Sequence, residues 1–142
     1  MASVPFHYID LRAFCYVTED DRRVADALRR FLPEECELTR ATSEGHHGDR
    51  ILVLSARVEN ADDVRVVLDA LGDLPEEQRE QLERERDDRV SDDCSFFLTL
   101  DKQAAYGGAV RLGEGITLRG KVEAYPATRE RALAALDESG FP

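Results

Sequence analysis

Residues 8–17 read Tyr8-Ile9-Asp10-Leu11-Arg12-Ala13-Phe14-Cys15-Tyr16-Val17, and this stretch decides the fold class. Apolar residues recur at every second position, which is the period of a β-strand that buries one face. The buried face is expected to hold Ile9, Leu11, Ala13, Cys15 and Val17, and the opposite face Tyr8, Asp10, Arg12, Phe14 and Tyr16. A strand of this kind needs a covering layer on one side only, so we expect helices to pack against that side.

The rest of the chain is predicted to hold groups of consecutive strands and helices, in the overall order β-α-β-β-α-α-β-β-β-α. Further strands are predicted at 37–43, 50–59, 94–101, 110–112 and 116–125, with a Gly-containing hairpin link at 44–49. Helices are predicted from Thr18 to Pro33, Asn60 to Gly72, Pro75 to about Val90, and Pro126 to Gly140. The third is almost entirely charged and is expected to be exposed. This order predicts an α+β fold of two layers, with helices on one face of a mostly antiparallel sheet. We expect a single domain over residues 1–142.

The charge balance is strongly acidic. The chain carries 30 acidic and 19 basic residues, for a net charge of −11, and Lys102 and Lys121 are its only lysines. Crowded carboxylates repel one another at low salt, but at molar salt the screening length falls to about 3 Å and this repulsion is largely removed. The composition is therefore typical of a halophilic protein, although an ordinary acidic protein is the alternative.

The residue types that carry catalysis or bind metals lack the spacing that they need. Cys15, Cys36 and Cys94 are far apart in sequence, which argues against disulfides and zinc knuckles. His46 and His47 are adjacent and point apart on an extended backbone, so we expect no metal site. The chain has no Gly-rich phosphate loop and no nucleophile elbow. The sequence therefore predicts no cofactor, no catalytic residues and no enzymatic activity.

The chain shows no membrane or export signal. Residues 1–7 lack a basic segment followed by an apolar run, and no stretch approaches the roughly 18 apolar residues that cross a bilayer. We therefore expect a cytoplasmic protein with no membrane partner.

A few cations and rings interrupt the acidic background in the C-terminal half. Arg119, Lys121 and Tyr125 share one face of the strand predicted at 116–125, Lys102, Gln103 and Tyr106 follow the preceding apolar strand, and Arg111 lies between. Cations and rings on an open sheet face bind phosphates and stack on bases. The alternative is that these cations pair with the surplus carboxylates and keep the sheet in solution.

Four segments resemble a known family. They are residues 7–12 (His-Tyr-Ile-Asp-Leu-Arg), 45–51 (Gly-His-His-Gly-Asp-Arg-Ile), 100–106 (Leu-Asp-Lys-Gln-Ala-Ala-Tyr) and 121–126 (Lys-Val-Glu-Ala-Tyr-Pro). In this order they resemble the small archaeal RNA-binding proteins described as predicted exosome subunits, and above all the haloarchaeal members. The resemblance implies a fold similar to the large-subunit ribosomal protein that binds the smallest ribosomal RNA. It marks Arg50, Lys102, Gln103, Tyr106 and Lys121 as candidate RNA contacts.

These observations predict a non-catalytic RNA-binding domain that acts in RNA processing or ribosome assembly. The predicted contacts are the polar sheet face and the hairpin at Gly45–Arg50, with RNA-processing proteins as further partners. The net charge of −11 opposes the binding of a polyanion, although molar salt weakens that objection. The alternative is an adaptor of an RNA-degrading, exosome-like complex that makes no RNA contact itself. An unrecognised enzyme is a third interpretation.

Overall fold

The computed structural model describes residues 4–44 and 50–139, and its centre is a five-stranded sheet in the order β2-β3-β1-β5-β4. Every pairing in the sheet is antiparallel. The strands are β1 (Phe6–Cys15), β2 (Thr39–Glu44), β3 (Arg50–Val58), β4 (Ser95–Asp101) and β5 (Gly115–Val122). The strand with the clearest two-residue alternation, β1, is thus the middle strand.

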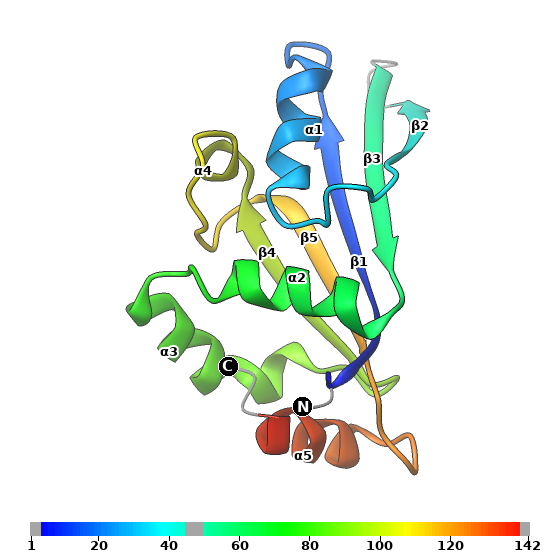
Figure 1. Cartoon of the computed structure of the whole chain (residues 1–142), viewed down its shortest axis with the longest axis vertical. Coiled ribbons are helices and arrows are strands. Elements are labelled where there is room, and N and C mark those ends of the chain that lie inside the picture. The colour runs from blue at the N-terminus through cyan, green and yellow to red at the C-terminus, as the bar shows by residue number, and fades with distance from the viewer. Residues whose placement is uncertain (1–3, 45–49, 140–142) are drawn as a thin grey trace.

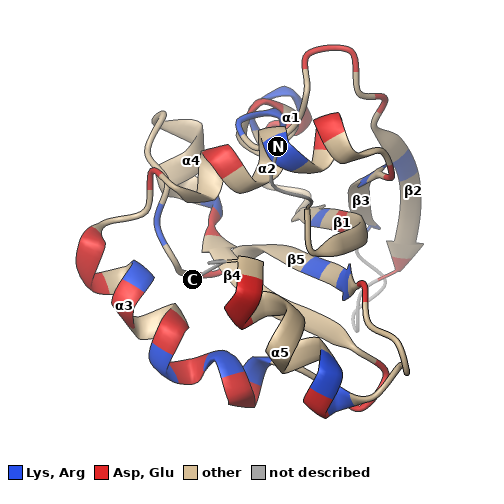
Figure 2. Cartoon of the chain, turned by 60° about the horizontal axis from the view of Figure 1, so that its bottom comes forward, with Lys and Arg blue, Asp and Glu red and all other residues tan. Residues whose placement is uncertain are grey.

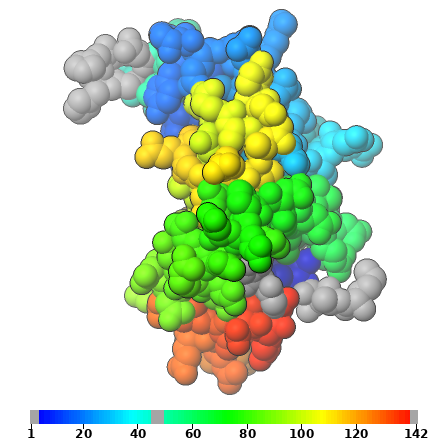
Figure 3. All heavy atoms as spheres, turned by 90° about the vertical axis from the view of Figure 1, so that its left-hand side faces the viewer, coloured from blue at the N-terminus to red at the C-terminus, as the bar shows by residue number. Residues whose placement is uncertain are grey.

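The helices lie on one side of this sheet and at one end of it. They are α1 (Asp21–Arg29), α2 (Ala61–Leu71), α3 (Glu76–Glu85) with the 3-10 turn η1 (Arg86–Arg89), α4 (Lys102–Tyr106) and α5 (Arg129–Ser139). Figure 1 shows α1 and α2 over one face of the sheet, with α5 beyond the end at which β1 begins. The short helix α4 packs against α1, and Figure 3 shows the two side by side.

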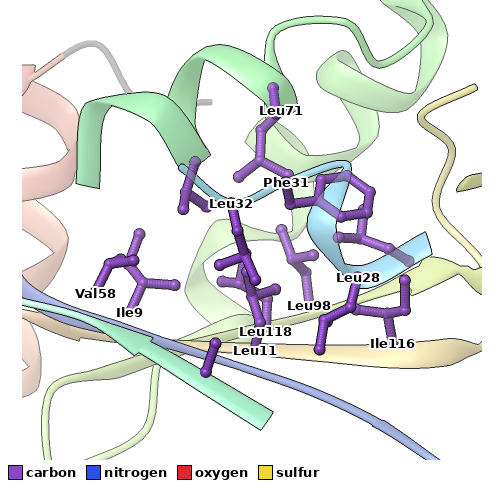
Figure 4. Close-up of a cluster of buried hydrophobic side chains, with 14 of the residues drawn as sticks. Ile9, Leu11, Leu28, Phe31, Leu32, Val58, Leu71, Leu98, Ile116 and Leu118 are labelled. Atoms are coloured by element: carbon purple, nitrogen blue, oxygen red, sulfur yellow. The ribbon is translucent and has the colours of Figure 1, made fainter. Parts of the chain in front are cut away.

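The hydrophobic core fills the space between the sheet and these helices. Ile9 and Leu11 of β1 are buried, and they face the helix layer with Leu118 of β5 (Figure 4). Leu28 of α1 and Phe31 just after it pack down onto them and are fully buried. Residues of period two on the sheet thus meet residues of period 3.6 on the helix, as the sequence patterns predicted.

The mixed α+β class and the antiparallel sheet are confirmed, and several boundaries differ. The strand predicted at 110–112 is reduced to an isolated bridge between Leu100 and Leu112. The segment after β4, where no helix was predicted, forms α4, because the Asp101 carboxylate accepts the Ala104 N–H and caps a helical turn. α1 starts at Asp21 rather than near Thr18, since Asp20 supplies its N-cap.

Two strands, β1 and β5, end earlier than predicted, because backbone hydrogen bonds after them lead the chain out of the sheet. β1 stops at Cys15 rather than Val17, because the Glu19 N–H donates to the Tyr16 carbonyl and closes a turn. β5 stops at Val122 rather than Tyr125, where the Glu123 N–H bonds to Pro5 outside the sheet. The predicted hairpin pairing is present, with Glu44 opposite Arg50, while most of its link, 45–49, falls outside the described residues.

Candidate nucleic-acid interface on the open face of the sheet

The face of the sheet turned away from the helices is open to solvent. Every second residue of each strand points there, and we call this set the open face. Its charged and aromatic members are Tyr8, Asp10, Arg12 and Phe14 of β1, Arg57 of β3, Phe97 and Asp101 of β4, and Arg119 and Lys121 of β5. Arg12, Arg57, Arg119 and Phe97 are exposed, and the rings of Tyr8 and Phe14 are half-buried.

One row of the open face crosses four strands in register. Arg57 lies opposite Asp10, Asp10 opposite Arg119, and Arg119 opposite Phe97. The next row sets Arg12 between the small polar residues Ser55 and Thr117. Because directly opposed side chains on one sheet face are about 5 Å apart, members of each row are in reach of one another.

Asp10 fixes the position of Arg57. The guanidinium donates from Nε to Asp10 Oδ1 at 2.7 Å and from Nη2 to Oδ2 at 2.9 Å, a two-pronged pair. The hydrogen bonds and charge of Asp10 raise the pKa of Arg57. The same guanidinium lies 4.1 Å from the centre of the Tyr8 ring. Arg57 is therefore held over a ring with its charge already matched.

Arg119 is held in the same way from the opposite side of the row. Its Nε donates to Ser95 Oγ at 3.2 Å and its Nη2 to Asp93 Oδ2 at 2.9 Å. Its guanidinium lies 5.6 Å from the centre of the Phe97 ring. Hydrogen bonds from Ser91 and Ser95 and the charges of Lys121 and Arg119 lower the pKa of Asp93, so this carboxylate stays ionised.

Arg12 and Lys121 complete the cations of this face. Lys121 donates from its ammonium to the Asp93 backbone carbonyl. Arg12 is exposed, and its side chain makes no ion pair or hydrogen bond with any residue that the structure describes. It lines a shallow hollow of about 280 Å³ with Asp10, Thr39 and Arg57. Arg12 is therefore a cation available to a phosphate.

The charge of the open face is opposite to that of the whole chain. Arg12, Arg57, Arg119 and Lys121 outnumber the acidic residues beside them, which are Asp10, Asp93 just before β4, and Asp101, whose carboxylate is engaged as the cap of α4. Elsewhere the acidic residues predominate, and Figure 2 shows α3 lined with both signs of charge and basic segments on β5. A chain of net charge −11 thus keeps a cationic sheet face.

Lys102 has a different environment from the other predicted contacts. Its side chain is buried, and its ammonium donates to Glu19 Oε1 at 2.7 Å and to the Phe14 carbonyl at 2.8 Å. Burial would raise the pKa of Glu19, but the hydrogen bonds from Lys102 and from the Tyr16 N–H outweigh it and lower that pKa. Lys102 thus ties α4 to β1 and to the loop before α1.

A pocket of about 430 Å³ between α1 and α4 collects three of the predicted contacts, Lys102, Gln103 and Tyr106. The Arg23 guanidinium lies 5.0 Å from the centre of the Tyr106 ring. Acidic residues of the loop before α1, Glu19 and Asp20, line the same pocket. Its positive and negative side chains are therefore matched within it.

The structure brings only part of the predicted set together. Arg119 and Lys121 lie two residues apart on the open face. Asp101, just before Lys102, pairs with Gly115 at one end of β5, while Ser95 pairs with Lys121 at the other, so the two lysines are separated by about 20 Å along the strand and form no common patch. Arg50 begins β3 opposite Glu44, Arg111 follows α4, and Tyr125 is 95% exposed beyond β5.

Sequence reasoning left out the residues that surround Arg119 on this face. Arg12, Arg57, Tyr8 and Phe97 were absent from the predicted contacts. The two-residue alternation of β1 did place Tyr8 and Arg12 on the polar face, so the signal was present there. Arg57 and Phe97 could not be assigned to this face from the sequence, because the sequence does not show which strands are neighbours in the sheet.

The described ranges, 4–44 and 50–139, contain neither a metal cluster nor a membrane span. No group of three His, Cys, Asp or Glu side chains converges there in a way that would hold a metal ion. His46 and His47 lie outside these ranges. The cysteines are all free, with Cys15 and Cys94 buried. None of the described helices combines the length and hydropathy needed to cross a membrane.

Known proteins with similar sequences come from archaea. A family model described as RNA binding matches residues 8–122. A protein of Pyrococcus abyssi that is named an RNA-binding protein is 35% identical over 141 residues, covering 93% of this chain and 92% of that protein. An uncharacterized protein of Methanocaldococcus jannaschii is 28% identical over 115 residues, covering 75% of this chain and 76% of its own length.

Solved structures share the fold over nearly the whole chain. A DUF54 protein of Methanothermobacter thermautotrophicus superposes with a TM-score of 0.74 at 35% identity, covering 94% of this chain and 97% of that one. A protein of Archaeglobus fulgidus from the same family gives a TM-score of 0.84 at 26% identity, covering 94% and 99% of the two chains.

Proposed function

The chain belongs to the family described as RNA binding, and from that premise we propose that it binds RNA through the open face of its sheet. The observation that carries the proposal is the sign of the charge there. Arg12, Arg57, Arg119 and Lys121 gather on one face of a chain whose net charge is −11. Contact with a phosphate backbone requires a cationic surface, and this otherwise acidic protein has one on its open face.

The proposed role is binding without catalysis. General acids work with a raised pKa, whereas Glu19, Glu85 and Asp93 all have lowered pKa values because hydrogen bonds and cations stabilise the charged form. These groups therefore behave as members of ion pairs.

We place this role in RNA processing or ribosome assembly in the archaeal cytoplasm, as the resemblance to exosome-associated and ribosomal-protein-like chains implies. The rival is an adaptor for RNA-processing proteins, which would present a contiguous apolar patch. Apart from the consecutive Tyr16 and Val17, the large apolar side chains exposed in the described residues come from separate segments, among them Val66 of α2 and Phe97 of β4. The scatter favours RNA over a protein partner.

The experiment is a charge-matched comparison of RNA affinity. The double variant Arg12→Ala/Lys121→Ala removes two cations from the open face, and Arg79→Ala/Arg131→Ala removes two exposed arginines from α3 and α5. Removing one phosphate-binding cation should reduce the salt slope by about 0.7 on single strands. With a random-sequence RNA pool in potassium chloride, the first variant should bind more weakly and with a shallower slope. The second should bind like the wild type, and equally weakened binding in both variants would contradict the proposal.

A further inference from the structure

Two pairs, each made of a guanidinium and an aromatic ring, lie on the open face, and their geometry suits contacts other than those with phosphates. Arg57 lies over the Tyr8 ring at 4.1 Å, and Arg119 lies over the Phe97 ring at 5.6 Å. A guanidinium donates hydrogen bonds in its own plane, so a carboxylate at its edge leaves its flat faces free for stacking. In each pair the guanidinium lies near the ring, and a carboxylate within hydrogen-bond distance matches its charge.

Both pairs remain accessible from solvent. The side chains of Arg57 and Arg119 are 49% and 44% exposed, and Phe97 is 38% exposed. Asp10 and Asp93 offset their charges with hydrogen bonds of 2.7–2.9 Å. A phosphate would have to displace these carboxylates, whereas a base needs only the flat surface. The pairs therefore suit bases better than phosphates.

The two pairs are also spaced for neighbouring bases. Arg57 and Arg119 belong to one row, separated by the single strand β1, which sets their backbones about 10 Å apart. The cations with a role toward phosphates, Arg12 and Lys121, lie in the rows on either side. Rings and cations thus alternate over a small, flat area, the arrangement by which sheets stack two or three bases of a single strand.

From this arrangement we infer that the RNA bound by the open face is single-stranded, with unpaired bases stacked on the Arg57–Tyr8 and Arg119–Phe97 pairs. The inference rests on the proposed function and names its substrate class. A double helix keeps its base faces inside and offers phosphates and 2′-hydroxyls instead. It would have to be held by cations, and two of the four on this face, Arg57 and Arg119, are already paired with carboxylates.

The experiment compares one strand with and without its complement. Fluorescence anisotropy is measured with labelled oligouridylate, and with the duplex that it forms with oligoadenylate, in potassium chloride. The wild type should bind the single strand at least ten-fold tighter than the duplex. Phe97→Leu removes a ring at an exposed position and should weaken single-strand binding about five-fold or more, the effect typical of one stacked base. Its duplex binding should stay unchanged.

Two matched variants separate stacking from folding. Phe97→Tyr retains the ring and should keep the wild-type affinity. Tyr106→Leu removes an exposed ring from α4, in the pocket beside α1 and away from the open face, and should also keep it. Duplex binding as tight as single-strand binding, or full affinity in Phe97→Leu, would overturn the inference while leaving RNA binding intact. Failure of the wild type to bind either RNA would instead overturn the proposed function on which the inference rests.

Discussion

The ammonium of Lys102 and the carboxylate of Glu19 are 2.7 Å apart in an almost buried site that joins α4 to the loop before α1. The side chains are 9% and 21% exposed, and Lys102 also donates to the Phe14 carbonyl. Water therefore screens this pair less than the ion pairs on the surface. Lys102, one of the two lysines in the chain, therefore has a structural role in joining α4 to the rest of the fold.

Replacing Lys102 should therefore destabilise the fold. Lys102→Ala leaves the Glu19 carboxylate and the Phe14 carbonyl without their donor, and we expect the free energy of unfolding to fall by about 2 kcal/mol. Lys121→Ala removes the less buried of the two lysines and should change the free energy of unfolding by about 0.5 kcal/mol or less. Denaturant titration of both variants measures the difference. Equal stability of the two would show that the Lys102–Glu19 pair contributes little.

The same pair sets a pH dependence. The pKa of Glu19 is lowered in the folded protein, so its contribution is fully present above the unfolded pKa of about 4.3 and is lost as pH falls through the folded value. Glu19→Gln should therefore be less stable than the wild type at neutral pH, and the gap should narrow below about pH 4. Unfolding curves of both proteins across this range are the measurement. A stability difference that stays constant with pH would mean that the pKa of Glu19 is the same in the folded and the unfolded protein.

Stability should also depend strongly on salt. The chain carries 30 acidic residues, and their mutual repulsion weakens as the screening length falls from about 10 Å at 0.1 M to about 3 Å at 1 M. We expect the midpoint of thermal unfolding to rise steadily from low salt into the molar range. Calorimetry in potassium chloride tests this. A midpoint that is flat over the range would remove the halophilic interpretation.

How much of this architecture follows from sequence depends on whether a feature is local. The alternation in residues 8–17 correctly predicts that Ile9, Leu11, Ala13 and Cys15 are buried, since that pattern depends only on the pleat of one strand. It is wrong for Val17, which lies beyond the end of β1 and is 71% exposed. The row of Arg57, Asp10 and Arg119 depends instead on the order β3-β1-β5, which brings distant segments together. No periodicity in one segment encodes its neighbours in the sheet.

Lys102 illustrates the same limit at a single residue. Its scarcity on an acidic chain favoured an exposed RNA contact, and the charge pattern contained no sign of burial. The Asp101 cap starts α4 and turns the Lys102 side chain toward Glu19, a residue 83 positions away. Arg119 and Lys121 were placed on one face correctly because two residues on one strand need only the period of that strand.

Asp93 provides the sharpest test of how the open face balances charge against stacking. Its carboxylate accepts from Arg119 at 2.9 Å and its carbonyl accepts from Lys121. An incoming phosphate must compete with that carboxylate for Arg119. Asp93→Asn removes the competing charge, so RNA affinity should rise at low salt by about three-fold to ten-fold, within the range of one exposed ion pair and one phosphate contact.

The salt dependence of that increase separates the two kinds of contact. A freed Arg119 adds a phosphate contact, so the salt slope of Asp93→Asn should steepen by about 0.7 relative to the wild type. In molar salt the increase should vanish, because screening removes the added attraction while base stacking persists. Asp73→Asn removes the carboxylate that pairs with Arg30 at 3.0 Å, away from the open face, and it should change neither affinity nor slope. If Asp93→Asn binds RNA like the wild type at low salt, then Asp93 and an RNA phosphate do not compete for the Arg119 guanidinium. Arg119 must in that case contact RNA only by stacking on a base.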